Sequence, residues 1–97
     1  MPLVSLRELL ADARQGGYGV LSLTGGTVEL VVGEIIATEE KRAPLVITFN
    51  ERLTPDVPIE IGIPLIVNAA RRAQVPIAAI LDHGQSFEAI VRAIHAG

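Results

Sequence analysis

Two adjacent side chains near the end of the sequence, Asp82 and His83, have the chemistry of an acid–base and metal-binding pair. A carboxylate can give or take a proton, and a neutral imidazole is a common metal ligand. One histidine cannot complete a zinc site, which takes three or four protein ligands. The dipeptide therefore leaves two alternatives open: a catalytic and metal-binding pair, or a capping carboxylate followed by an ordinary turn residue.

Two other short polar segments also follow apolar runs: residues 24–26, with the sequence Thr-Gly-Gly, and the pair Asn50-Glu51. Glycines ahead of a helix can let backbone N–H groups approach a phosphate. The sequence contains neither the full dinucleotide-binding glycine pattern nor a P-loop lysine, so a tight turn is the alternative for Gly25-Gly26. Asn50-Glu51 either binds a substrate through hydrogen bonds or turns the chain.

The elements that must position these residues begin with three apolar runs, at residues 18–23, 44–49 and 75–81. Each run is short, rich in strand-forming residues and closed by one of the polar segments. The second and third runs are almost continuously apolar, which is typical of strands that are buried on both faces. We therefore expect three strands.

Helix signals lie before and between these runs. Ser5 and Glu8 have the capping-box spacing, and Gly16-Gly17 supplies a stop, so a short amphipathic helix is expected between them. A second helix is expected over residues 27–41, because its valines and isoleucines recur at helical spacing. On this assignment its charged residues, Glu34 among them, lie off the apolar stripe.

The rest of the chain predicts a loop and two further helices. Residues 52–61 contain two prolines, which cannot donate to a regular hydrogen-bond ladder, and are expected to form a loop. Pro64 suits the first turn of a helix that ends near Gln74. Ser86 is expected to cap the last helix.

Alternation of strands and helices indicates an α/β fold with a parallel sheet and right-handed crossovers. In such folds the loops that follow the strands meet at one edge of the sheet, where ligands bind. All three polar segments are therefore expected at a common rim. We expect a single domain over residues 1–97, divided into an N-terminal helix (1–17) and three strand–helix units (18–43, 44–74 and 75–97).

The amino-acid composition excludes several classes of protein. The chain has 97 residues, enough for one domain, and 49% of them are hydrophobic, which excludes intrinsic disorder. Its net charge of −3 offers no attraction for nucleic acid or for anionic membranes. The sequence contains no cysteine, and it contains no secretory signal or long apolar span, so a soluble cytoplasmic protein is expected.

Three segments resemble the N-terminal part of the class II fructose-bisphosphate (ketose-bisphosphate) aldolases. They are MPLVSLRELLADARQGGYGV, EEKRAPLVITF and VPIAAILDHGQSFEAIVRAIHAG, and together with their spacing they cover nearly the whole chain. The most specific element is VPIAAILDHG followed by SFE, which is similar to the family signature VPV-x-x-HLDHG after the third strand of a TIM barrel.

The resemblance implies a zinc-dependent lyase that cleaves phosphorylated ketoses, of the fructose- or tagatose-bisphosphate type, into dihydroxyacetone phosphate and an aldehyde. It implies that Asp82 is the proton-transferring acid/base and His83 a zinc ligand. Asn50 and Thr24 stand at positions that contact the substrate in the family. The implied partners are a phosphorylated sugar and either further copies of the chain or the rest of a barrel.

Departures from the family pattern accompany this resemblance. The first His of the signature is Ile80 here, and the substrate-contacting Asn after the first strand is Thr24. The family barrel has eight strand–helix units, and three cannot close it. On the face that would line the barrel we expect about six exposed apolar strand side chains, each worth roughly 1.5–3 kcal/mol when buried. With two unpaired sheet edges, such a chain is expected to associate.

Two function classes follow for the isolated chain. The first is a segment of an aldolase-like lyase that is inactive alone, because one imidazole and one carboxylate leave zinc undercoordinated. The second is a non-catalytic interaction module derived from the same fold, which Ile80, Thr24 and Gly26 favour. A flavodoxin-like phosphate binder built on Gly25-Gly26 is a third possibility.

Overall fold

Helices and strands alternate along the chain in the computed structural model, which describes residues 2–52 and 55–97. The elements are α1 (Leu6–Gly16), β1 (Leu21–Thr24), α2 (Val28–Lys41), β2 (Leu45–Asn50), α3 (Ile59–Arg72), β3 (Ile77–Asp82) and α4 (Phe87–Ala96). The strands form a sheet in the order β1-β2-β3, and both pairs are parallel. The predicted fold class, an N-terminal helix followed by three strand–helix units, is confirmed. None of the helices in the described ranges is long and apolar enough to cross a membrane.

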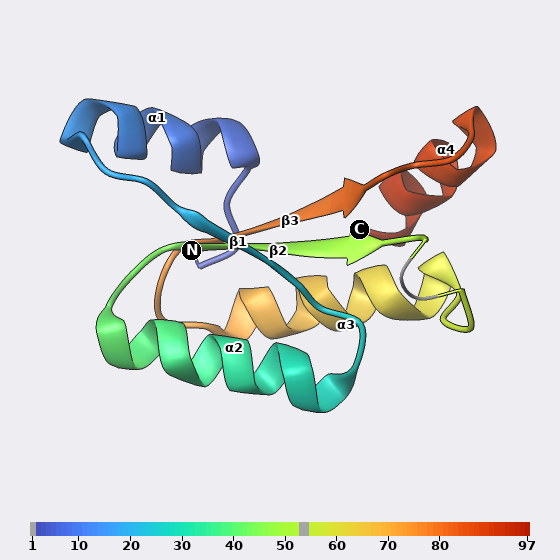
Figure 1. Ribbon diagram of the computed structural model, residues 1–97, viewed down its shortest axis with the longest axis horizontal. Coiled ribbons are helices and arrows are strands. Elements are labelled where there is room, and N and C mark those ends of the chain that lie inside the picture. Colours follow the sequence, from blue (N-terminus) through green and yellow to red (C-terminus); the bar gives the residue numbers. More distant parts are fainter. Residues whose placement is uncertain (1, 53–54) are drawn as a thin grey trace.

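Helices lie on both faces of the sheet, with α1 on one side and α2 and α3 on the other (Figure 1). Successive strand residues point to opposite faces, so each strand contributes to two apolar clusters. Ile47 and Phe49 belong to the larger cluster with Ile66 of α3, and all three are fully buried. Val46 belongs to a smaller cluster with Leu9 of α1. This two-sided burial explains the continuous hydrophobicity of the second apolar run.

Side-chain caps set the helix starts that the sequence predicts. The Ser5 hydroxyl accepts a hydrogen bond from the Glu8 N–H at 3.1 Å, and the Glu8 carboxylate accepts one from the Ser5 N–H. Gly17 ends α1 in the left-handed conformation, with φ 72°. Thr27 and Ser86 cap α2 and α4 through their hydroxyls. The caps are local, which is why the sequence indicates those at Ser5 and Ser86 and places the start of α2 near Thr27.

The start of α3 corrects the sequence prediction. The loop expected over residues 52–61 ends earlier, because α3 begins at Ile59 after the cap residue Pro58, and residues 53 and 54 lie outside the described residues. Pro64 is inside the helix and not in its first turn. A helix-interior proline costs about 3 kcal/mol, but α3 buries six residues against the sheet and α4, and this burial maintains the helix.

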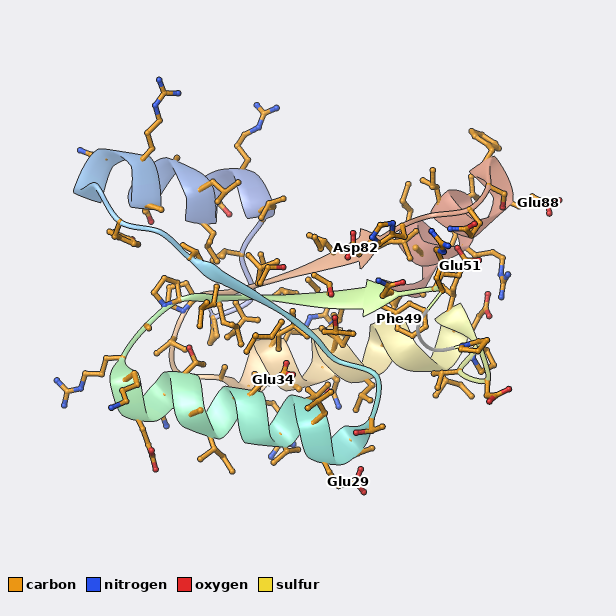
Figure 2. All side chains as sticks on the ribbon, in the orientation of Figure 1. Glu29, Glu34, Phe49, Glu51, Asp82 and Glu88 are labelled. Atoms are coloured by element: carbon orange, nitrogen blue, oxygen red, sulfur yellow. The ribbon has the colours of Figure 1, made fainter. Side chains whose placement is uncertain are left out.

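The orientation of α2 also differs from the prediction. Val31 and Thr38 are its buried residues, whereas Val28, Val32 and Ile36 are all exposed. The Glu34 carboxyl group, expected to lie off the apolar stripe, instead has one buried oxygen, and Figure 2 shows this residue between α2 and the sheet. The rotation of α2 is set by its packing against α3 and the sheet, which the spacing of its apolar residues does not determine.

The barrel-side face of the sheet is less apolar than expected. By register and alternation, the residues on this face are Ser22, Thr24, Val46, Thr48, Asn50, Ala78, Ile80 and Asp82. Three of the eight are apolar, and α1 covers two of these, Val46 and Ala78, which are buried. The prediction of about six exposed apolar side chains on this face was therefore wrong, because α1 and polar strand residues occupy it.

The two sheet edges differ as well. Beside β3, residues 2–4 form a short parallel bridge: the Val4 N–H donates to the Ile77 carbonyl, and the Ile77 N–H donates to the Pro2 carbonyl. Within the described residues β1 pairs with β2 alone, so its outer edge is open. The prediction of two unpaired edges was therefore wrong at the start of β3.

An ion pair between Glu60 of α3 and Arg92 of α4 joins the last two helices. Two hydrogen bonds, of 2.6 and 2.7 Å, run from the guanidinium to the carboxylate. The hydrogen bond from Arg92 lowers the pKa of Glu60 from 4.5 to about 2. Because the folded-state pKa is lowered, the stabilisation is complete above pH 4.5 and is lost as the pH falls through 2.

We therefore expect the thermal midpoint of the chain to exceed that of Glu60→Gln above pH 4.5, with a difference that shrinks toward zero near pH 2. Circular dichroism melts at half-unit pH intervals measure this difference. Glu40→Gln removes an exposed carboxylate from α2 and serves as the control, for which no such convergence is expected. A difference between the chain and Glu60→Gln that is constant from pH 6 to pH 2 would contradict the assignment.

Candidate active site

Asn50 and Asp82 stand side by side at the carboxyl ends of β2 and β3. They are Cα partners in the parallel register, so both side chains project from the barrel-side face. Asn50 is buried, and its side-chain oxygen accepts a hydrogen bond of 2.9 Å from the Arg52 N–H. Two of the three strand ends thus bring polar side chains together, as the sequence predicts.

Thr24 lies on the same face of the sheet as Asn50 and Asp82, but farther from the rim than they do. Its Cα partner is Thr48, which precedes Asn50 by two residues, and the two threonine hydroxyl oxygens are 3.4 Å apart. A two-residue step along a strand is about 6.6 Å, so Thr24 lies below the rim at which Asn50 and Asp82 stand. Thr48 is a buried polar residue of this face that the sequence interpretation missed, because it lies inside an apolar run.

Asp82 and His83 are both accessible at the rim. The Asp82 Oδ1 atom is 4.0 Å from the His83 Nε2 atom, and the side chains are 42% and 56% exposed, respectively. His83 has a positive φ of 55°, in the left-handed region that non-glycine residues seldom adopt. This backbone conformation turns the chain immediately after β3, and it places the imidazole next to the carboxylate.

A hydrogen bond between neighbouring loops holds the rim together. The Glu51 carboxylate accepts a hydrogen bond of 3.0 Å from the Gln85 N–H, which links the loop after β2 to the loop after β3. The Gln85 side chain also donates to the His83 carbonyl at 2.7 Å. Figure 2 shows Glu51 and Asp82 at the same end of the sheet. Glu51 therefore joins the two loops, a role that its position in the sequence does not reveal.

Gly25 has a packing role. Its N–H donates to the Thr48 carbonyl at 2.8 Å and so is already engaged. A Cβ atom at this position would come within 2.7 Å of Ile47 and 2.8 Å of Val31. Glycine is therefore required for close contact between the strand and helix layers, which favours the turn interpretation and argues against phosphate binding through Gly25.

The residues suited to a metal ion form an incomplete set. His83 offers an exposed imidazole, and the Asp82 Oδ1 atom lies 4.0 Å from its Nε2 atom. Across residues 2–52 and 55–97 no group of three His, Cys, Asp or Glu side chains is arranged to hold a metal. The chain thus fits a metal site as the donor of one ligand, with further ligands required from elsewhere.

Comparison with known proteins agrees with this geometry. The family model for class II fructose-bisphosphate aldolase matches residues 4–97. A "Probable fructose-bisphosphate aldolase" of Bacillus subtilis is 33% identical over the whole chain, and a fructose-bisphosphate aldolase of Thermus caldophilus is 32% identical over 98% of it. The crystal structure of the YdjI aldolase from Escherichia coli K12 superposes with a TM-score of 0.89 at 29% identity, covering 98% of this chain.

The matched part of each relative is small. The chain spans 35% of the Bacillus subtilis protein, 31% of the Thermus caldophilus protein and 37% of the Escherichia coli chain. Its three strand–helix units correspond to part of an aldolase TIM barrel. The chain belongs to the class II fructose-bisphosphate aldolase family and comprises about a third of the length of these relatives.

Proposed function

We propose that this chain is the barrel segment of a class II aldolase that acts on a phosphorylated ketose, with Asp82 as the acid/base and His83 as one zinc ligand. The observation that carries the proposal is the pairing of Asn50 with Asp82 across β2 and β3, next to an exposed imidazole. A carboxylate, an imidazole and an amide at one rim, where ligands of parallel α/β sheets bind, support these roles.

Each residue has a separable task in this proposal. His83 would hold the metal through an imidazole nitrogen, and bound zinc would polarise the ketose carbonyl as a Lewis acid. Asp82 moves a proton at a substrate hydroxyl. Asn50 orients the substrate by hydrogen bonds. Thr24 lies too deep to be equivalent to these rim groups and contributes, with Thr48, to the polar wall below them.

The isolated chain is expected to be inactive under this proposal. Only one of the three or four ligands that zinc needs has been identified at the rim, and the remaining strand–helix units of a barrel would supply the others. The physiological form is either assembled with those units or associated with further copies of the chain. We expect it to function in the cytoplasm, consistent with a sequence that contains no cysteine.

The test joins the chain to the part of the Bacillus subtilis relative that it does not match. The completed barrel is expected to bind zinc and to cleave fructose 1,6-bisphosphate or tagatose 1,6-bisphosphate. His83→Ala is expected to weaken zinc binding by more than 100-fold, beyond the roughly 10–100-fold effect of a residue that only orients a ligand. Metal analysis by mass spectrometry and a coupled cleavage assay measure both.

His95→Ala is the matched control, because this histidine is on α4, away from the rim. Zinc content and cleavage that survive His83→Ala unchanged would contradict the metal-ligand assignment. Chelator-sensitive cleavage by the isolated chain would contradict its expected inactivity.

A non-catalytic interaction module is the second candidate, and Ile80 favours it. Ile80 stands on the barrel-side face two residues below Asp82, where the family signature has a histidine. An aliphatic side chain there can neither donate nor accept a proton. Zinc binding without cleavage in the completed barrel, together with recovery of cleavage in Ile80→His, would assign the loss of chemistry to this residue.

A further inference from the structure

The side chain of Gln85 contacts the backbone of His83, two residues before it. The Gln85 amide donates a hydrogen bond to the His83 carbonyl at 2.7 Å. His83 has a φ of 55°, and residues other than glycine persist in this left-handed region only where neighbouring groups stabilise them there. The amide binds the carbonyl of the strained residue itself, so the contact restrains the turn that follows β3.

A second contact fixes the backbone of Gln85. Its N–H donates to the Glu51 carboxylate at 3.0 Å, and Glu51 directly follows Asn50, the Cα partner of Asp82. Figure 2 shows Glu51 and Asp82 at the same end of the sheet. The loop after β2 therefore holds Gln85 at its backbone, while the Gln85 side chain holds His83.

Neither helix capping nor core packing accounts for the Gln85 side chain. Ser86 is the cap residue of α4, and its hydroxyl accepts a hydrogen bond from the Ala89 N–H at 3.1 Å. Gln85 is exposed and belongs to neither apolar cluster. Its amide is thus free of both structural tasks, and its contact with His83 has another consequence.

We propose that Gln85 is a positioning residue: its amide, anchored through Glu51, holds His83 in the left-handed conformation that keeps the imidazole beside the Asp82 carboxylate. The inference rests on the proposed function in that the imidazole so held is the zinc ligand. Gln85 acts through His83 and is not itself a ligand. Groups that orient a metal-binding histidine typically change metal affinity by about 10–100-fold, so loss of the amide weakens zinc binding without abolishing it.

Gln85→Met tests the proposal, because methionine has nearly the length of glutamine but has no amide donor. In the completed barrel this change is expected to weaken zinc binding by about 10–100-fold, measured by competition with a chromophoric chelator. The urea midpoint is expected to stay unchanged, because Gln85 is exposed. Gln74→Met is the matched control, since Gln74 is exposed and precedes β3 at the other end of the strand, and its zinc affinity should equal that of the unmodified barrel.

NMR of the isolated chain without metal reports the conformation of His83 separately from zinc binding. A positive φ brings the Hα atom of a residue close to its own amide proton, so a strong NOE between these two protons of His83 is expected. The NOE should weaken in Gln85→Met. Glu51→Leu is expected to weaken both the NOE and zinc binding, whereas Glu51→Gln keeps an oxygen that can accept from the Gln85 N–H and should preserve both.

The outcomes separate this inference from the proposed function. A Gln85→Met barrel that binds zinc as tightly as the unmodified barrel, while His83→Ala loses zinc, would overturn the inference and leave the proposed function standing. An unchanged His83 NOE in Gln85→Met would overturn it as well. If the completed barrel binds no zinc through His83 while the NOE depends on Gln85, the proposed function fails and the positioning of His83 by Gln85 is supported.

Discussion

Replacement of Asp82 by Asn in the completed barrel is expected to lower kcat for ketose-bisphosphate cleavage by about 10²–10⁴-fold, the usual contribution of a positioned acid/base. The amide has the shape of the carboxylate but cannot accept a proton. Asp82 is 42% exposed at the end of β3, so the substitution should leave the fold and the zinc content unchanged. A steady-state assay with parallel metal analysis separates loss of proton transfer from loss of metal.

Asp12→Asn is the control, because Asp12 is an exposed residue of α1, a helix that Figure 1 shows at the opposite end of the sheet from α4 and the strand ends. Its kcat should equal that of the unmodified barrel. An Asp82→Asn barrel with kcat within a factor of three of the unmodified barrel would exclude Asp82 as the acid/base. The proposed function would then require another proton-transferring group at the rim, and Glu51, in the loop after β2, would be the next candidate to test.

Gly62→Ala is expected to lower the free energy of unfolding by about 1–3 kcal/mol, although alanine is the better helix former. Gly62 is in α3, and an added Cβ would collide with the ring of Phe49, including its Cδ2 atom at 2.5 Å. Phe49 is fully buried in the larger cluster, so its ring can give way only by displacing packed neighbours. Urea unfolding followed by circular dichroism measures the change.

Gly33→Ala provides a matched control in α2, where a new Cβ would meet nothing within 4 Å. It is expected to raise the free energy of unfolding by about 0.5–1 kcal/mol, because alanine loses less backbone entropy than glycine. Changes of opposite sign in the free energy of unfolding for Gly62→Ala and Gly33→Ala would isolate the steric effect of the added Cβ atom. Phe49→Leu combined with Gly62→Ala should recover part of the loss, and a Gly62→Ala chain as stable as the unmodified one would refute the packing argument.

Local signals explain how much of the fold could be predicted from the sequence. The caps at Ser5, Thr27 and Ser86 are formed by residues three positions apart, so the starts of three helices were readable. The start of α3 was not, because Pro64 suits a first turn in the sequence, whereas tertiary burial begins the helix at Ile59, directly after the cap residue Pro58.

The candidate site, too, could be predicted from the sequence only in part. Asn50 and Asp82 could be expected at one rim because parallel strands end at one edge of a sheet. The hydrogen bond from Gln85 to Glu51 joins residues 34 positions apart, and no pattern in the sequence indicates it. The burial of one Glu34 oxygen depends on how α2 is rotated against the neighbouring layer, which the spacing of its apolar residues does not reveal.

The bridge between residues 2–4 and Ile77 has a consequence for the order of events during synthesis. Residues 2–4 pair with a strand that is translated more than seventy residues after them. The backbone donors and acceptors of residues 2–4 stay hydrated until β3 has been synthesised. Contacts of such long range in sequence are slow to form. Completion of the α1 layer is therefore tied to the arrival of the third strand, and a nascent chain stalled before Ile77 would keep its first residues undocked.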